Sequence, residues 1–272
     1  MPAPEAGLAD DRSLIEEAVR AAGDIAKKYF GGDYKRWDKG AGQPVTEADL
    51  AVDKYLRETL LKARPEYGWL SEETEDDPAR LEKKNVFVVD PIDGTIAFLK
   101  KRPHFTICVA VVREGRPIVG VVLNPILNEC FAATVGEGAT LNGAPIHVSD
   151  RATLEGCRMC AARSMFEHPA WNNPPNRPWP PMHIETRNSV AYRMALVANG
   201  AFDATLALSA KRDWDMAAAD LIVHEAGGIV TAHDGGVPRY NGANAIQPSL
   251  IAAGPKLYAE ILSRVRHINL QR

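Results

Sequence analysis

Four short segments of the sequence carry carboxylate side chains of the kind that bind metal ions or move protons. They are residues 46–49 (TEAD), 71–74 (SEET), 90–95 (DPIDGT) and 213–215 (DWD). The segments lie near the ends of predicted helices and strands. Side chains at such ends can meet from distant parts of a chain, so we expect the four segments to contribute to one site.

The segment DPIDGT follows an apolar strand at residues 86–89, so Asp90 lies at the carboxyl end of that strand. Pro91 takes the chain out of the strand ladder, and Gly94 permits a tight turn, so Asp90 and Asp93 can point into one volume. Two carboxylates at close range repel each other unless one takes up a proton or a cation lies between them. Mg²⁺ prefers carboxylate, water and phosphate oxygens. We therefore expect a magnesium site here, with the N–H groups of Gly94 and Thr95 suited to a phosphate.

Each acidic segment also has a purely structural explanation. Asp49 is the acidic member of a capping box with Thr46, and Asp215 lies in the first turn of a helix, where the helix dipole favours an anion. Glu72 lies in the stretch SEETEDD, which is typical of a solvated loop. Taken singly, these explanations are the stronger ones. A covalent aspartyl mechanism of the haloacid-dehalogenase type is disfavoured, because Asp93 follows Asp90 by three residues rather than two.

Helices and strands alternate along the chain. Helices are predicted at residues 13–30, 46–63, 189–199, 213–226 and 255–265, and strands at 86–89, 105–112, 118–123, 129–134, 158–162, 202–208, 229–231 and 250–253. This alternation predicts a layered arrangement of sheets and helices. Residues 168–181 contain six prolines and two tryptophans, which predicts a loop. A surface excursion is favoured over a lid for this loop, but its role stays open.

Composition narrows the class of protein. The 272 residues carry a formal charge of −3, with 46% hydrophobic and 25% charged residues. This balance excludes a broad cationic face for a nucleic acid polymer, and no apolar run approaches the ~20 residues that a membrane span needs. The N-terminus has no secretory pattern, so we expect a cytoplasmic protein. The lone pair Cys157 and Cys160 favours burial over zinc or redox chemistry.

Taken together, the acidic segments resemble the signature of the inositol monophosphatase superfamily of Mg²⁺-dependent, often lithium-sensitive phosphomonoesterases. The matching text is PVTEAD (44–49), LSEET (70–74), VVDPIDGTIAF (88–98), GVVLNP (120–125), GATLNG (138–143) and DWDMAAADLIVHEAGG (213–228). The similarity covers about residues 13–265. It implies an α/β fold, a layered α-β-α-β-α sandwich, with an α+β half at 1–150 that carries most metal ligands. An α/β half at 151–272 would complete the site.

The resemblance also implies the metal ligands, for two or three Mg²⁺ ions. Glu72, Asp90 and the backbone carbonyl of Ile92 would hold the first ion. Asp90, Asp93 and Asp215 would hold the second, and a weaker third ion would lie near Glu72.

The catalytic residues that the resemblance implies are Asp49, Thr95 and Glu72. Asp49 and Thr95 would orient the attacking water and pass on its proton. Asp93 and the backbone amides of Gly94 and Thr95 would contact the phosphate. No Ser or His nucleophile is needed for such a reaction, and none of the seven His residues lies in an H-E-x-x-H or triad-like pattern.

Three departures from the family pattern bear on the substrate. Leu208 occupies the place where inositol monophosphatases carry a Glu that contacts inositol. Ile96–Ala97 stands where inositol monophosphatases usually have Thr-Asn and nucleotidases have Lys-Glu. Lys211 and Arg212 precede the DWD turn, as basic residues often do in 3'(2'),5'-bisphosphate nucleotidases. Two cations suit a substrate with a second phosphate, although they could equally be loop residues exposed to solvent.

We therefore expect a small-molecule phosphomonoester as the partner, with 3'-phosphoadenosine 5'-phosphate, hydrolysed to AMP and phosphate, as the leading substrate. The alternatives are an inositol monophosphatase, a broad sugar-phosphate phosphatase, or a metal- and phosphate-binding regulatory module without turnover. No nucleic acid polymer and no membrane is expected as a partner. The resemblance leaves a homodimer open.

Overall fold

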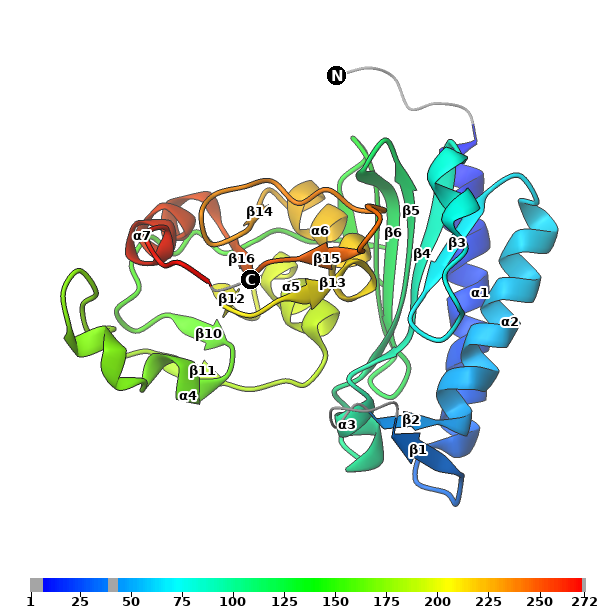
Figure 1. Cartoon of the computed structure of the whole chain (residues 1–272), viewed down its shortest axis with the longest axis horizontal. Helices are drawn as coiled ribbons and strands as arrows, with labels where there is room; N and C mark the ends of the chain where they lie inside the picture. The colour runs from blue at the N-terminus through cyan, green and yellow to red at the C-terminus, as the bar shows by residue number, and fades with distance from the viewer. Residues whose placement is uncertain (1–6, 39–43, 271–272) are drawn as a thin grey trace.

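The computed structural model describes residues 7–38 and 44–270, which form five alternating layers of helix and sheet. In Figure 1 these layers follow one another across the molecule, from α1 and α2 at one side to α7 at the other. A seven-stranded sheet, a pair of helices and a five-stranded sheet lie between them. This confirms the layered arrangement that the sequence pattern predicts and the α-β-α-β-α order that the resemblance implies.

The helices and strands have the following bounds. The helices are α1 (Leu8–Tyr29), α2 (Glu47–Ala63), α3 (Thr95–Leu99), α4 (Arg163–Phe166), α5 (Val190–Ala198), α6 (Asp213–Glu225) and α7 (Pro255–Val265), with 3₁₀ turns η1 (Pro78–Glu82) and η2 (Pro169–Asn172). The first sheet has the order β3 (Gly68–Ser71), β4 (Asn85–Asp93), β5 (Thr106–Arg113), β6 (Arg116–Asn124), β7 (Glu129–Thr134), β8 (Ala139–Leu141) and β9 (Ala144–Pro145). The second has the order β11 (His183–Glu185), β10 (Arg158–Cys160), β12 (Ala204–Ala207), β16 (Leu250–Ala253) and β14 (Ile229–Thr231). Two small pairs are β1 (Arg36–Asp38) with β2 (Pro44–Thr46), and β13 (Lys211–Arg212) with β15 (Ile246–Gln247).

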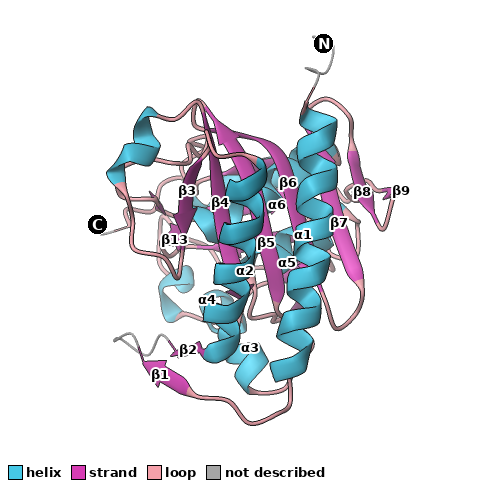
Figure 2. Cartoon of the chain, turned by 90° about the vertical axis from the view of Figure 1, so that its right-hand side faces the viewer, coloured by secondary structure: helices cyan, strands magenta, loops and turns pink. Residues whose placement is uncertain are grey.

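The outer helices α1 and α2 cover one face of the first sheet, and Figure 2 shows them lying across it. Ile15 and Val19 of α1 and Leu56 of α2 recur at helical spacing, and all three are buried. They pack in one apolar cluster with Phe87 and Val89, which point to the same side of β4. The apolar stripe of each helix therefore fixes its position on the sheet.

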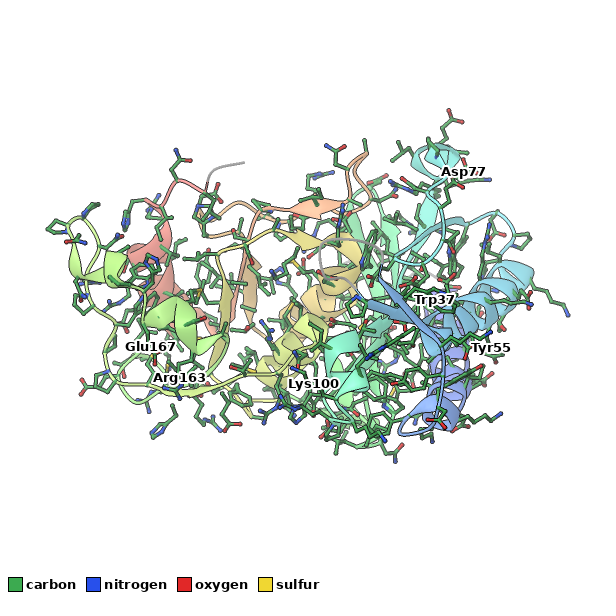
Figure 3. The ribbon with its side chains drawn as sticks, turned by 60° about the horizontal axis from the view of Figure 1, so that its bottom comes forward. Trp37, Tyr55, Asp77, Lys100, Arg163 and Glu167 are labelled. Carbon is green, nitrogen blue, oxygen red and sulfur yellow. The ribbon has the colours of Figure 1, made fainter. Side chains whose placement is uncertain are left out.

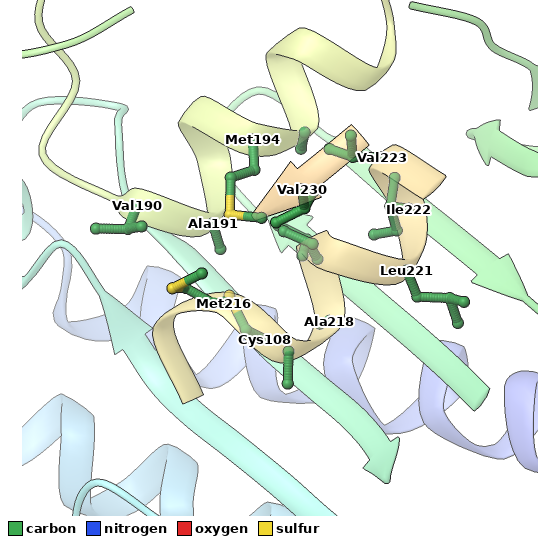
Figure 4. Packing of buried hydrophobic residues seen from close by; sticks show 14 of the residues in the cluster. Cys108, Val190, Ala191, Met194, Met216, Ala218, Leu221, Ile222, Val223 and Val230 are labelled. Carbon is green, nitrogen blue, oxygen red and sulfur yellow. The ribbon is translucent and has the colours of Figure 1, made fainter. Parts of the chain in front are cut away.

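The helices α5 and α6 lie between the two sheets and are apolar on nearly all sides. Figure 4 shows Met216 and Ala218 of α6 facing Cys108 of β5, with Met194 of α5 close by. Where α6 crosses β6 there is a glycine, and a Cβ atom built on Gly120 would come 2.5 Å from the carbonyl oxygen of Ala218. Only glycine permits this close approach of helix to strand.

The outer face of the second sheet packs against α7 and the proline-rich segment. Leu257 and Ile261 of α7 are buried in one cluster with Trp171. The predicted loop at residues 168–181 is therefore partly regular, because it contains η2. The indole rings of Trp171 and Trp179 pack edge to face within it, with their ring centres 5.2 Å apart. A proline at the first turn suits a short 3₁₀ helix, which the proline count alone did not predict.

The four cysteines are free and buried, which confirms the prediction made for Cys157 and Cys160. Burial raises the pKa of Cys157 to about 12 and that of Cys160 to about 11. These thiols therefore stay protonated and serve as small core residues.

Several predicted boundaries need correction. β4 continues to Asp93 instead of ending at residue 89, because a bulge between Asp90 and Asp93 keeps the strand paired with β5. α1 begins at Leu8 instead of residue 13. The short strands β3, β11, β13 and β15 carry little alternation of their own and were not predicted from the sequence. Within the described helices, none is both long and apolar enough to cross a bilayer.

Candidate active site

Asp90 and Asp93 lie at the end of β4, and both are buried. The bulge inserts one extra residue between the pairs Asp90–Cys108 and Asp93–Thr106, which changes the direction of the strand at this point. The backbone N–H of Ile92 donates to Asp90 Oδ1 over 3.0 Å. Burial raises the pKa of Asp90 well above its ordinary value, and repulsion from other carboxylates adds to this. In decreasing order these are Glu72, Asp93, Asp215 and Asp49.

Asp93 is held by the start of helix α5 in the second half of the chain. Ser189 Oγ donates to Asp93 Oδ2 over 2.6 Å, and the N–H of Ala191 donates to the same oxygen over 2.7 Å. Ser189 is fully buried and also contacts the hydroxyl of Thr106 at 2.9 Å. Burial raises the pKa of Asp93 despite these hydrogen bonds. The end of β4 is therefore joined directly to the start of α5.

Asp215 reaches the same region from the first turn of α6. Its Oδ2 accepts a hydrogen bond of 3.0 Å from the N–H of Arg212, so it caps the helix. Burial, followed by repulsion from Asp93, raises the pKa of Asp215 to about 7. Asp215 can therefore cap α6 and belong to the group of carboxylates at the same time.

Asp49 of α2 and Thr95 of α3 contact each other, and Asp49 is one of the carboxylates that act on Asp90. Asp49 completes the predicted capping box, because its Oδ2 accepts a hydrogen bond of 2.8 Å from the N–H of Thr46. Its Oδ1 lies 3.4 Å from Thr95 Oγ1, which is also 3.2 Å from the carbonyl oxygen of Ile92. Burial raises the pKa of Asp49 to about 6, so this carboxyl can exchange a proton near neutral pH.

Glu72 reaches the site from the turn after β3. Its N–H donates to the carbonyl oxygen of Val89 over 3.3 Å, which places the turn beside β4. Asp53 of α2 holds this turn on both sides, because it accepts hydrogen bonds from Ser71 Oγ and, over 2.6 Å, from Thr74 Oγ1. Residues 71–74 therefore form a fixed turn, whereas Glu75, Asp76 and Asp77 are exposed, as the solvated-loop explanation predicts.

Sequence reasoning missed Asp53 and Ser189. Asp53 lies four residues after Asp49, on the same face of α2, and this spacing is a signal that the sequence offers. Ser189 precedes the predicted helix at 189–199, where Ser is a common N-cap, but nothing in the sequence names Asp93 as its partner. Contacts between distant segments decide both roles.

Lys211 and Arg212 differ in their surroundings. The ammonium of Lys211 donates to the hydroxyl and carbonyl oxygens of Ser209, over 2.8 and 3.2 Å. Burial lowers the pKa of Lys211, while Asp215 and Asp93 nearby raise it. Arg212 is exposed, and its guanidinium carbon lies 5.6 Å from the ring centre of Trp214. Lys211 is therefore the cation whose charge acts on both Asp93 and Asp215 from a partly buried position.

The donor atoms at this site are all oxygens, and that chemistry fits Mg²⁺. Repulsion from neighbouring carboxylates contributes to the raised pKa of Asp90 and of Asp215, and a divalent cation would offset this repulsion. Within residues 7–38 and 44–270, no three Asp, Glu, His or Cys side chains stand close enough together to enclose an ion. Mg²⁺ binding at these residues therefore requires carboxylate side chains to turn toward it.

Comparisons with known proteins identify the family of the chain. Residues 9–270 match the model of the Inositol monophosphatase family. The "Nus factor SuhB" of Pasteurella multocida is 33% identical over 265 residues, which is 93% of this chain and 95% of that protein. An "Inositol-1-monophosphatase" of Caulobacter vibrioides is 32% identical over 267 residues, or 93% and 99% of the two chains. The crystal structure of the extragenic suppressor protein suhB from Bartonella henselae has a TM-score of 0.82 at 28% identity, over 94% of this chain and 98% of that one. The chain therefore belongs to the inositol monophosphatase family, whose members are phosphatases.

Proposed function

We propose that this phosphatase is a Mg²⁺-dependent phosphomonoesterase whose preferred substrate is 3'-phosphoadenosine 5'-phosphate. The observation that carries the metal-dependent reaction is the group of buried carboxylates from three separate elements that raise one another's pKa. Beside them lies the contact between Thr95 and Asp49. Such a group is costly to bury without a cation, so a binding role accounts for it better than a structural role.

The proposed ligands are Glu72, Asp90, Asp93, Asp215 and the carbonyl oxygen of Ile92. They would hold two or three Mg²⁺ ions. When bound, Mg²⁺ lowers the pKa of water and stabilises negative charge on phosphate oxygens. The ligands are buried or partly buried, and a site shielded from water strengthens electrostatic interactions with a phosphate.

Asp49 and Thr95 would handle the proton of the attacking water. Thr95 Oγ1 lies between Asp49 Oδ1 and the carbonyl oxygen of Ile92, so its hydroxyl hydrogen can be donated to either. A water that donates to Thr95 Oγ1 would be oriented by this hydroxyl, and Asp49 would take up the proton. The backbone amides of Gly94 and Thr95 would then face the phosphate.

The substrate preference is supported by Lys211 and Leu208. Lys211 is partly buried and interacts electrostatically with Asp215 and Asp93, and a cation in that position suits a second phosphate. Leu208 packs against an apolar cluster and has no group that could bond an inositol hydroxyl. Inositol 1-phosphate is the second candidate, because a relative with 32% identity is named an inositol-1-monophosphatase.

Phosphate release tests both parts of the proposal. We expect the purified protein with Mg²⁺ to hydrolyse 3'-phosphoadenosine 5'-phosphate faster than inositol 1-phosphate, to lose activity in EDTA and to be inhibited by Li⁺. Asp90→Asn should lower activity by more than roughly 100-fold, because replacing a residue that only supports a metal ligand already costs up to about that factor. The exposed Asp150→Asn serves as its control. Full activity in EDTA would refute the metal site, and faster hydrolysis of inositol 1-phosphate would refute the substrate.

A further inference from the structure

Asp213 begins the DWD segment and is fully buried, yet it has no place among the proposed metal ligands. Three hydrogen bonds join it to one segment, residues 238–247. The N–H of Asn241 and the side-chain amide of Gln247 each donate to one carboxylate oxygen of Asp213 over 2.7 Å. The N–H of Asp213 donates to the carbonyl oxygen of Ala245 over 3.0 Å. We refer to residues 238–247 as the strap, because they hold the first residue of α6 at its backbone and at both carboxylate oxygens.

Arg80 of η1 joins the strap to the first half of the chain. Its Nη1 donates to the side-chain oxygen of Asn241 over 2.5 Å, and its Nη2 donates to the carbonyl oxygen of Gly242 over 3.2 Å. Asp76 accepts hydrogen bonds from Nε over 2.6 Å and from Nη2 over 2.9 Å. Because two parallel bonds to a carboxylate fix the direction of a guanidinium, Asp76 aims Arg80 at the strap.

The side chain of Arg80 is buried, although the turn that carries it lies at the surface. Figure 3 shows Asp77, which caps η1, at the outer edge of the molecule, whereas the Arg80 side chain is only 1% exposed. Arg80 also packs closely on β3, because a Cβ atom built on Gly68 would come 3.0 Å from Arg80 Cβ. A charged side chain is almost never fully buried unless it is paired. The contacts with Asp76 and the strap therefore account for the burial of Arg80.

Asp213 carries the effect of the strap to Asp215. Both residues lie in the first turn of α6, so a shift of this turn moves both carboxylates. On the other side, Arg80 packs on β3, and β3 pairs with β4, which carries Asp90. The contact between Arg80 and the strap therefore ties the first turn of α6 to the sheet that carries the other carboxylates.

We propose that Arg80 is a positioning residue for Mg²⁺ binding, which holds Asp215 in place relative to Asp90. This inference rests on the proposed metal site and names a residue outside it. Arg80 touches neither the ion nor the substrate, and it acts through Asn241 and Asp213. Without this contact the first turn of α6 is held less firmly, so Asp215 is less often in place for the ion and Mg²⁺ binds more weakly.

Calorimetry of Mg²⁺ binding in the absence of substrate tests this role. A residue that directly supports a metal ligand contributes roughly 10- to 100-fold to metal affinity, and Arg80 acts from further away, so we expect Arg80→Gln to weaken Mg²⁺ binding about 3- to 10-fold. The Mg²⁺ concentration for half-maximal phosphate release should rise by the same factor, with kcat largely recovered at saturating Mg²⁺. The matched control is Lys83→Gln, which removes an exposed cation at the end of the same turn and should bind Mg²⁺ as the wild type does.

A second variant separates positioning from folding. Asn241 has a left-handed backbone, with a φ of 61°, which glycine adopts without strain. Asn241→Gly therefore removes the side-chain partner of Arg80 and keeps the course of the strap, and it should also weaken Mg²⁺ binding. The double variant should bind Mg²⁺ no more weakly than Arg80→Gln alone, because both changes break the same contact. Urea unfolding of the metal-free proteins measures their stability separately.

The outcomes distinguish this inference from the proposed function. If the wild type binds Mg²⁺ and Asn241→Gly and Arg80→Gln bind it equally well, the positioning role is wrong and the metal site stands. Lower stability without weaker Mg²⁺ binding, or effects that add in the double variant, would also overturn the role. If Arg80→Gln does not fold, the Mg²⁺ affinity of Asn241→Gly decides. If the wild type neither binds Mg²⁺ nor needs it for phosphate release, the metal site itself is wrong.

Discussion

Asp49, Asp93 and Asp215 each combine a structural hydrogen bond with a place in the charged cluster. Asp49 and Asp215 cap α2 and α6, and Asp93 accepts hydrogen bonds from the start of α5. A helix N-terminus stabilises negative charge, which partly offsets the cost of burying these carboxylates together. The same backbone hydrogen bonds fix the position of each carboxylate. The starts of the helices therefore position the site.

Asp53 should position Glu72 without contacting the substrate. Asp53→Asn weakens the two hydrogen bonds that hold the turn after β3. We expect the Mg²⁺ concentration for half-maximal activity to rise roughly 10- to 100-fold, with kcat largely recovered at saturating Mg²⁺. Titration of activity with Mg²⁺ measures this, and Glu58→Gln, an exposed change one turn further along α2, is the control. An unchanged Mg²⁺ dependence in Asp53→Asn would contradict the positioning role.

Asp49 should make the metal-free protein less stable as pH rises. Its pKa is raised from 3.8 to about 6, so the folded state binds this proton more tightly than the unfolded state. The stabilisation is complete below pH 3.8 and is lost as pH rises through about 6. A shift of about two pKa units corresponds to roughly 3 kcal/mol.

Urea unfolding in EDTA measures this effect. We expect the stability of Asp49→Asn relative to wild type to increase by about 3 kcal/mol between pH 4 and pH 7.5, because asparagine does not titrate. Asp150→Asn, at an exposed carboxyl, should follow the wild-type curve. The pKa assignment is wrong if wild type and Asp49→Asn lose stability in parallel.

At the scale of elements, the contact between β6 and α6 determines how far α6, and with it Asp215, lies from the first sheet. Gly120→Ala would bring a methyl group to 2.5 Å from the carbonyl oxygen of Ala218, so α6 must move away from the sheet. We expect a loss of about 1–3 kcal/mol in the free energy of unfolding. Because Asp215 lies on α6, the activity per folded molecule should fall as well.

Urea unfolding and phosphate release, measured on the same preparation, separate these two effects. Gly32→Ala is the matched control, because a Cβ atom there meets its nearest neighbour at an ordinary 3.6 Å. Lower stability with unchanged activity would show that α6 does not transmit the displacement to Asp215.

Elements with a strong pattern of their own could be predicted from the sequence. The hairpin of β5 and β6 and helices α2 and α7 lie within a few residues of their predicted bounds. The bulge that extends β4 to Asp93 could not be predicted, because the pairing of Asp93 with Thr106 depends on the neighbouring strand. The acidic segments were found from their residue types, whereas the contacts of Asp53 and Ser189 arise only after the chain has folded.

At the scale of the whole molecule, the two sheets share one core. Val88 and Ala110 of the first sheet and Leu250 and Ala252 of the second belong to the same apolar cluster, which α6 completes. The division into halves at residues 1–150 and 151–272 stays a prediction. The change from one sheet to the other falls between Pro145 and Arg158. The phosphate site would likewise need both parts, because Asp90 and Asp215 come from different sides of this change.

The shared helix α6 has a consequence for biosynthesis. A ribosome makes the strands of the first sheet well before it makes residues 213–225, and domains tend to fold as they emerge. The apolar face that α6 later covers is therefore open to water while the nascent chain grows. A chaperone that holds this face should be needed until Glu225 has left the exit tunnel.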